Sequence, residues 1–241
     1  YAIECSLNKV LGSETLDYVV DEGVQIHGGY GFMAEYEVER AYRDSRINRI
    51  FEGTNEINRL LVPGTYLRKA MKGELPLLQK AQALQEELMM LMPEEVGEGV
   101  LEQEKHLLKN AKKIGLMIAG LAAQKYGQAL QKEQEILVNI EDIVSNVYAM
   151  ESAILRTEKA INKSGEAKNS QKLLYTQVYC QEAFNEIEAH AKESLVAIEQ
   201  GDTLRMMISA LRKFTRHTPI NVIAKKREIA AALIEENGYR A

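Results

Sequence analysis

The sequence predicts an all-α protein, and two observations support this prediction. Only 4 prolines and 16 glycines interrupt 241 residues, so long helices are permitted over most of the chain. Apolar residues recur at three- and four-residue spacing in most segments, whereas no segment alternates apolar and polar residues for long enough to predict a strand. A hydrophobic share of 46% against 27% charged residues is typical of a chain with a globular core.

Three helices are predicted before residue 72. Residues 1–26 repeat apolar side chains at helical spacing, with Leu16 among them, and end at a glycine-rich corner. A second helix, rich in arginine, is expected over residues 36–50, and a third over residues 55–71. Thr54 is the expected N-cap of the third helix, because its hydroxyl can accept a hydrogen bond from a backbone N–H of the first turn.

The character of the chain changes between residues 72 and 100. A short amphipathic helix is expected near residues 79–92, among a dense group of helix-breaking residues: Gly73, Pro76, Pro93, Gly97 and Gly99. We therefore expect a first helical domain over residues 1–71, a linker with one short helix over residues 72–100, and a separate domain over residues 101–241.

Residues 101–241 predict an antiparallel helical bundle. Short turns connect three long helices, and each helix carries an apolar stripe with four- and three-residue spacing, as in a coiled-coil seam. The stripes are Leu107, Ala111, Ile114, Ile118 and Leu121; Ile136, Ile140, Ile143, Val147, Met150 and Ile154; and Val178, Phe184, Ile187, Ala191, Leu195 and Ile198. Two shorter helices are expected over residues 202–216 and 221–236, with Thr218–Pro219 as a helix-start signal.

Charge and cysteine content exclude several classes of function. A net charge of −5 argues against a nucleic-acid-binding protein, which normally carries a basic excess. Cys5 and Cys180 are too few for a disulfide framework or a thiolate zinc site, and they indicate free thiols in a reducing compartment. No metal site is expected, because the bundle glutamates lack the Glu-x-x-His pairs of carboxylate metal centres.

The sequence predicts neither a membrane span nor a leader. No run of about 18 apolar residues is present, and no signal peptide or initiator methionine is found. The chain begins at Tyr1 inside a helical pattern, so we expect it to be a piece of a longer protein.

The glycine-rich corner at His27–Phe32 has two interpretations. Successive exposed backbone N–H groups can form a cradle for a phosphate or another anion. A glycine-rich turn between two helices gives the same pattern without any ligand. The residues alone leave both interpretations open.

The run Phe51–Asn55 is more informative. Glu52 stands between an aromatic residue and a glycine, directly before a helix N-terminus. Apolar neighbours would raise the pKa of this carboxyl and make it a usable base near neutral pH, and Gly53 would let a ligand approach the backbone closely. The alternative is a surface glutamate in a turn between helices.

Residues 25–59 together resemble the C-terminal signature of the acyl-CoA dehydrogenases. The matching blocks are Gln25–Phe32, Glu39–Arg40, Tyr42–Asp44 and Arg49–Ile57 with Arg59, and their order and spacing make the match specific. The helical extension that follows is similar to the very-long-chain branch in architecture and order. The resemblance implies the end of the family's C-terminal helical bundle followed by a second antiparallel bundle.

The resemblance also implies a function. It indicates an FAD-dependent enzyme of fatty-acid β-oxidation that oxidises long-chain acyl-CoA to trans-2-enoyl-CoA. Glu52 matches the base that removes the α-proton, and Gly53 matches a substrate contact. FAD contacts fall on Thr54, Asn55 and Glu56, and the loop that reaches the FAD of the dimeric partner falls on Gln25, Ile26, His27, Gly28 and Gly29. Arg43 is expected to pair locally on its helix.

Several further expectations follow from the resemblance. We expect a homodimer that uses an electron-transferring flavoprotein as electron acceptor. We expect at most peripheral membrane contact, and a location in the cytoplasm of a bacterium or on the matrix side of a mitochondrion. The family's N-terminal helical domain and middle β-domain are absent from these residues, so the chain alone is expected to be inactive. The alternative is a non-catalytic helical module for dimerisation or scaffolding, in which Glu52 is idle.

Overall fold

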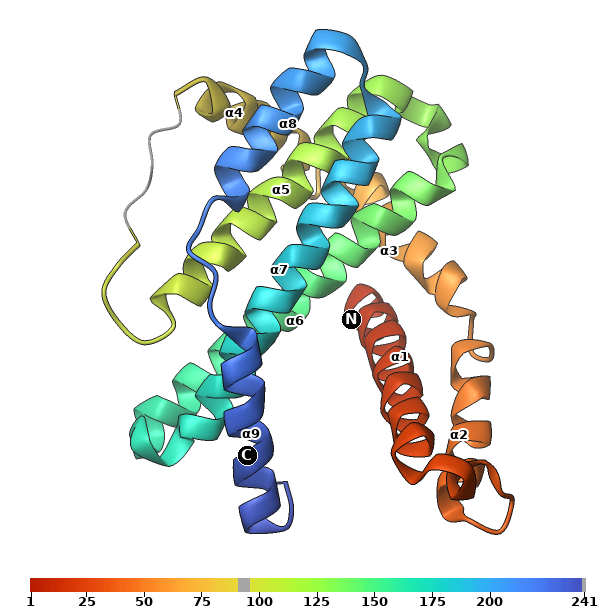
Figure 1. Cartoon of the computed structure of the whole chain (residues 1–241). Coiled ribbons are helices and arrows are strands. Elements are labelled where there is room, and N and C mark those ends of the chain that lie inside the picture. Colours follow the sequence, from red (N-terminus) through yellow and green to blue (C-terminus); the bar gives the residue numbers. More distant parts are fainter. Residues whose placement is uncertain (91–95, 240–241) are drawn as a thin grey trace. The chain divides into compact units, whose positions relative to one another are not determined.

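The computed structural model describes residues 1–90 and 96–239, and no strand occurs within these ranges. The all-α prediction is therefore confirmed. The elements in chain order are α1 (Ala2–His27), η1 (Gly28–Phe32), α2 (Glu37–Ser45), η2 (Arg46–Arg49), α3 (Asn55–Met71), α4 (Leu77–Met90), α5 (Glu102–Tyr126), η3 (Gly127–Lys132), α6 (Gln134–Ser164), η4 (Ala167–Asn169), α7 (Ser170–Ile198), α8 (Gly201–Thr215) and α9 (Val222–Glu236), where η marks a 3₁₀ helix (Figure 1).

The chain forms two compact units. The first contains Tyr1–Leu75 and Gln131–Glu141, and the second contains Pro76–Leu130 and Asp142–Ala241. Residues 91–95 of the expected linker lie outside the described residues, and the three-part domain division stays a prediction.

In the first unit, α1 packs against both α2 and α3. Its buried face includes Ile3, Leu7 and Val10, but Ser6 and Ser13 also lie on this face. Buried hydroxyl groups need hydrogen-bond partners, so this helix presents polar as well as apolar contacts to its neighbours.

The predicted apolar stripe of α1 is wrong at Leu16, which is 41% exposed. The buried face passes through Val10 and Ser13, and three more residues along an α-helix turn the side chain about 60° further round the axis. Leu16 is therefore carried past the edge of the contact, whereas Val20 returns to it and is 8% exposed.

The helix predicted over residues 36–50 is shorter than expected. Its α-helical part ends at Ser45, and a 3₁₀ turn follows. The Ser45 hydroxyl donates to the Tyr42 carbonyl at 2.7 Å, and the Asn48 amide donates to the Ser45 carbonyl at 3.1 Å. Such side-chain bonds compete with the α-helical ladder, which explains the early end. The predicted local pairing of Arg43 is confirmed by an ion pair to Glu39 at 3.2 Å.

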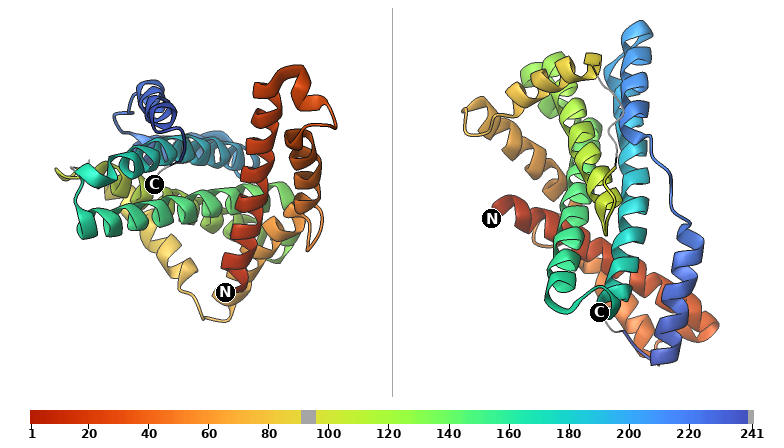
Figure 2. Two further views of the ribbon diagram at one scale, coloured as in Figure 1. Left: turned by 90° about the horizontal axis from the view of Figure 1, so that it is seen from below. Right: turned by 90° about the vertical axis from the view of Figure 1, so that its left-hand side faces the viewer.

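In the second unit, long helices run side by side as a bundle (Figure 2). The apolar residues predicted on the three long helices are buried, except Val147, which is half-buried. Polar contacts also lie within this core; for example, the hydroxyls of Thr157 on α6 and Thr176 on α7 are 2.8 Å apart. Burial of these stripes is the main source of stability for such a bundle.

The helix predicted over residues 221–236 is confirmed, but the predicted start signal at Thr218–Pro219 lies outside it. Helix α9 begins at Val222, and the Asn221 side chain caps it by accepting from the Ala224 N–H at 3.0 Å. The preceding segment is held in a non-helical form by two side chains, since Gln103 donates to the Thr218 carbonyl at 2.8 Å and the Ile220 N–H donates to Gln181 Oε1 at 3.3 Å. The asparagine cap therefore fixes the start, as its side-chain chemistry favours.

Candidate functional site

The turn before α3 holds Glu52 in an uncommon backbone conformation. Glu52 has φ 55° and Gly53 has φ 83°, so two successive residues lie in the left-handed region. This region is uncommon for a residue other than glycine, and it persists where surrounding contacts enforce it. Within the described residues, the Glu52 N–H donates to no protein acceptor. The turn thus presents an exposed carboxylate together with an available N–H donor.

Two side chains from different helices hold this turn. Lys9 of α1 donates from Nζ to the Gly53 carbonyl at 2.7 Å, and Asn58 of α3 donates from Nδ2 to the same oxygen at 2.8 Å. Asn58 also donates to the Thr54 carbonyl at 3.1 Å. A Cβ on Gly53 would lie 3.0 Å from the Asn58 amide nitrogen. Glycine is therefore required here both by its φ and by the close approach of Asn58.

The N-terminus of α3 follows the predicted capping pattern. Thr54 is the N-cap, and its hydroxyl accepts from the Ile57 N–H at 3.3 Å, which confirms that prediction. The pKa of the Glu56 carboxyl is lowered, chiefly by a hydrogen bond from its own backbone N–H and further by the Thr54 hydroxyl. The positive end of the helix dipole favours an anion at the same place.

Asn55 differs from its neighbours because its side chain is buried and fully engaged. It is 2% exposed, its Oδ1 accepts from Lys9 Nζ at 2.7 Å, and its Nδ2 donates to Ser13 at 2.9 Å and to Glu14 at 3.0 Å. These bonds tie the start of α3 to α1. Any cofactor contact at Asn55 therefore falls to its backbone.

A buried charged cluster lies next to this hydrogen-bonded group. Arg59 forms two bonds to the Glu14 carboxylate, at 2.6 and 2.9 Å, and its Nε lies 3.5 Å from the carboxylate of Glu141, which is 0% exposed. Burial acts to raise the pKa of Glu14, but hydrogen bonds from Arg59 and Asn55 and the nearby positive charges outweigh it, so the pKa is lowered. The cluster joins α1, α3 and the first turns of α6.

The glycine-rich corner lies at the C-terminal end of α1. Gln25, Ile26 and His27 form the last turn of the helix, and Gly28 ends it with φ 58°. The backbone at Gly28 and Gly29 is open, because a Cβ on either residue would meet nothing within 4 Å. The His27 ring bonds through Nδ1 to the Gly23 carbonyl at 2.8 Å. The corner thus offers exposed backbone.

The same corner exposes large apolar side chains. Ile26 is 81% exposed, Phe32 is 84% exposed and Tyr30 is 63% exposed. Apolar side chains grouped in this way commonly mark a surface that another molecule covers.

Gly31 provides a test of the corner's geometry. A Cβ on Gly31 would lie 2.5 Å from the Val24 carbonyl oxygen, so Gly31→Ala forces the backbone apart. We expect a loss of roughly 1–3 kcal/mol in the free energy of unfolding, the usual cost of overpacking. Thermal unfolding of the chain measures this loss, with Gly29→Ala as the matched control. Equal melting temperatures for the two variants would contradict the close approach.

The structure brings together the members of each motif but not the two motifs. Lys9, which touches the Glu52 turn, is separated from Gly28 along α1 by about 28 Å at ~1.5 Å rise per residue. The glycine-rich corner and the Glu52 turn therefore lie at different places along α1.

One sequence expectation about Glu52 is not met. Apolar surroundings were expected to bury the carboxyl, but Glu52 is exposed and the neighbouring Phe51 is 48% exposed. The described residues alone do not shield this group from water. Sequence reasoning also missed Lys9 and Asn58, for which the one local signal was a polar side chain beside the buried face of each helix.

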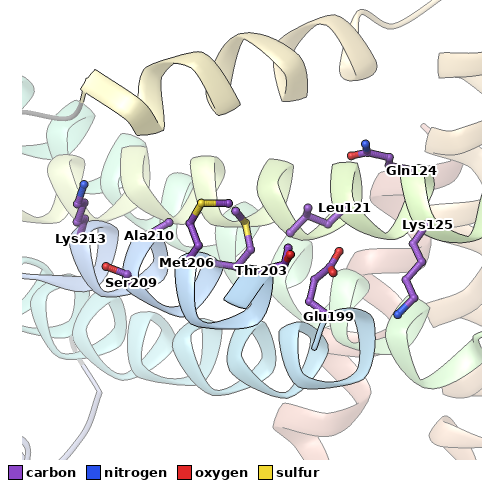
Figure 3. Close-up of a pocket in the computed structure, with 10 residues that line it drawn as sticks. Leu121, Gln124, Lys125, Glu199, Thr203, Met206, Ser209, Ala210 and Lys213 are labelled. Atoms are coloured by element: carbon purple, nitrogen blue, oxygen red, sulfur yellow. The ribbon is translucent and has the colours of Figure 1, made fainter. Parts of the chain in front are cut away.

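The second unit contains a groove of its own. It has a volume of about 810 Å³ between α5 and α8, and Leu121 and Met206 lie across it (Figure 3). The amine of one lining residue, Lys125, donates to the Ile198 carbonyl. None of the predicted site residues lines the groove.

The described residues include neither a metal-binding cluster nor a membrane-spanning helix. No group of three or more histidine, cysteine, aspartate or glutamate side chains is placed to hold a metal ion in these ranges. Among the described helices, none combines the length and the apolar character needed to cross a bilayer.

Comparison with known proteins identifies relatives along the whole chain. Residues 2–65 and residues 110–213 each match a family model described as "Acyl-CoA dehydrogenase, C-terminal domain". A "Probable acyl-CoA dehydrogenase" of Bacillus subtilis is 77% identical over 239 residues, which are 99% of this chain and 40% of that protein. The "Very long-chain specific acyl-CoA dehydrogenase, mitochondrial" of Homo sapiens is 56% identical over 62 residues, which are 26% of this chain and 10% of that protein.

A solved structure has the same fold. The "Crystal Structure of Acyl-CoA Dehydrogenase complexed with FAD from Bacillus anthracis" superposes with a TM-score of 0.98 at 79% sequence identity. The match covers 100% of this chain and 41% of that one. The chain thus spans about two fifths of the length of the relatives that it matches throughout.

Proposed function

Since the chain belongs to the acyl-CoA dehydrogenase family, we propose that the whole protein is an FAD-dependent oxidoreductase. In this proposal it converts long-chain acyl-CoA to trans-2-enoyl-CoA in fatty-acid β-oxidation, and the present chain is its C-terminal part. The observation that carries the proposal is the turn at Glu52. It presents, from one residue in an enforced conformation, an exposed carboxylate and an N–H that donates to no acceptor among the described residues.

Glu52 is proposed as the base. Its carboxylate takes the proton from the α-carbon of the thioester while a hydride leaves the β-carbon, so the two C–H bonds break and the C=C bond forms. The chemistry that bound FAD supplies is acceptance of this hydride. The α-proton of a thioester is weakly acidic, so the reaction needs a donor to the thioester oxygen as well as a base. The Glu52 N–H is available for that bond, and Gly53 leaves the approach to it open.

The proposed FAD contacts fit the geometry of both motifs. Thr54, Asn55 and Glu56 form the N-terminal turn of α3, where backbone N–H groups and the helix dipole suit an electron-rich partner. Gln25, Ile26, His27, Gly28 and Gly29 form an exposed corner with open backbone, suited to the FAD of a second subunit. The separation of the two motifs along α1 supports this division between subunits.

The remaining parts of the proposal concern the whole protein. We propose a homodimer that passes electrons to an electron-transferring flavoprotein, in the cytoplasm or on the matrix side of a mitochondrion, with at most peripheral membrane contact. The exposed Ile26 and Phe32 support a partner at the corner. We also propose residues 101–241 as a separate bundle domain and the 241-residue chain alone as inactive.

Binding and reduction of the flavin test the proposal. The whole protein should purify yellow, and anaerobic addition of palmitoyl-CoA should bleach the flavin absorbance. The 241-residue chain, prepared in the same way, should be colourless and unreactive. A colourless whole protein that neither binds FAD nor reacts with acyl-CoA of any length would instead favour a scaffolding module.

A further inference from the structure

We propose that Lys9 of α1 is a positioning residue for Glu52, because it fixes the turn that carries the carboxylate. The inference rests on the proposed function, in which Glu52 is the base. It assigns a role in that reaction to a residue outside the signature run, 43 positions earlier in the chain.

The turn at Glu52 has a backbone conformation that other contacts must hold. Glu52 and Gly53 have φ values of 55° and 83°. A non-glycine residue in this region is strained, so without outside contacts the turn has lower-energy alternatives that move the carboxylate. The exposure of Glu52 and Phe51 means that side-chain packing does not hold the turn. Hydrogen bonds to its carbonyl groups must do so.

Lys9 joins the turn to another helix, α1, through a hydrogen bond to the Gly53 carbonyl. Its Nζ lies 2.7 Å from the Gly53 carbonyl oxygen and 2.7 Å from Asn55 Oδ1. Asn58 also donates to the Gly53 carbonyl, at 2.8 Å, but it belongs to α3, the helix that directly follows the turn in the chain. Lys9 alone of these two donors fixes the turn relative to α1.

The positive charge of Lys9 strengthens its bonds to the turn. Both hydrogen-bond partners of the Lys9 amine are neutral oxygens, and no carboxylate is paired with it in the described part of the chain. A hydrogen bond from a charged donor is about twice as strong as one between neutral groups. The Lys9 ammonium group bonds to a backbone carbonyl and to a buried side-chain amide. It is therefore placed to hold the conformation of the turn rather than to form a surface ion pair.

Substitution of Lys9 with methionine removes the amine and keeps the length of the side chain. In the whole protein, Lys9→Met should lower the rate constant of flavin reduction by about tenfold or more, because a shift of about 1 Å in a catalytic group can cost up to 10²-fold. The acyl-CoA concentration that half-saturates the reaction should stay within about twofold, since Lys9 touches no proposed ligand. Lys9→Arg, which retains a charged donor, should recover part of the rate.

A second measurement does not depend on activity. The Ile57 and Asn58 N–H groups bond to the hydroxyl and carbonyl of Thr54 and therefore report on the turn. In the 241-residue chain, Lys9→Met should speed their hydrogen exchange by about tenfold, the factor expected for loss of a charge-assisted bond. Exchange at Leu67, later in α3, should stay unchanged. Lys69→Met, at an exposed lysine of the same helix, is the matched control.

Two results would overturn the proposal. One is unchanged exchange at Ile57 and Asn58 together with unchanged flavin reduction. The other is faster exchange throughout α1 and α3 with weaker substrate binding, which would make Lys9 a general structural residue. Failure of the proposed function itself is seen separately, as normal flavin reduction in Glu52→Gln with the exchange effect of Lys9→Met intact.

Discussion

Replacing Glu52 with glutamine in the whole protein is expected to lower the rate of flavin reduction by at least about 10²-fold, the low end of general-base contributions. Glutamine has the shape of glutamate but accepts no proton at neutral pH. The backbone of the turn is held by Lys9 and Asn58, neither of which bonds to the replaced side chain. Acyl-CoA should therefore still bind, and the loss should appear in the reduction step.

Rapid mixing of the oxidised protein with palmitoyl-CoA measures this step directly. Glu74→Gln is a suitable control, because Glu74 is exposed and lies outside both motifs. A change in absorbance on binding, without subsequent bleaching, is the expected behaviour of Glu52→Gln. Flavin reduction at the unaltered rate would show that Glu52 is not the base. Loss of bound FAD would instead show that the turn has a structural role in holding the cofactor.

The sequence predicted α3 closely because its local signals agree. Thr54 is an N-cap followed by helix-forming residues, and the helix begins at Asn55 as expected. The stripes of the second unit were also predictable, because each helix buries one face and the four-three spacing identifies it. Local bonds from Ser45 and Asn48 shortened α2, and the Asn221 cap, rather than Thr218–Pro219, sets the start of α9 within one residue of the predicted position. In both cases a polar side chain acted on the backbone nearby.

The contacts that hold the Glu52 turn were beyond prediction from the sequence. Lys9 and Gly53 are 44 positions apart, and nothing local to either residue indicates their pairing. Asn55 was assigned to the cofactor from the family signature, whereas the structure turns its side chain toward Ser13 and Glu14. Long-range polar contacts depend on how helices pack, and hydrophobic periodicity gives no information about them.

The buried cluster around Arg59 leads to the largest expected effect on stability. Arg59→Met removes the cation beside Glu141, whose side chain is 0% exposed, and removes both bonds to Glu14. Removing one partner of a buried ion pair takes away the cation that stabilises the other charge, which typically costs about 3–5 kcal/mol. Urea unfolding of the 241-residue chain, followed by circular dichroism, should show this loss in the transition of the first unit.

A second substitution separates charge from packing. Because the cost comes from a buried carboxylate that has lost the Arg59 cation, adding Glu141→Gln to Arg59→Met should recover most of the loss. Adding Glu14→Gln should recover little, since Glu14 is 39% exposed. The pH dependence follows from Glu14. Its pKa is lowered from 4.5 in the folded chain, so the ionised form stabilises the fold above that pH, and this stabilisation is lost as the pH falls through the lowered pKa. Arg59→Met should therefore lose less stability on acidification than the unaltered chain, and an equal acid loss in both proteins would show that Arg59 does not set the pKa of Glu14.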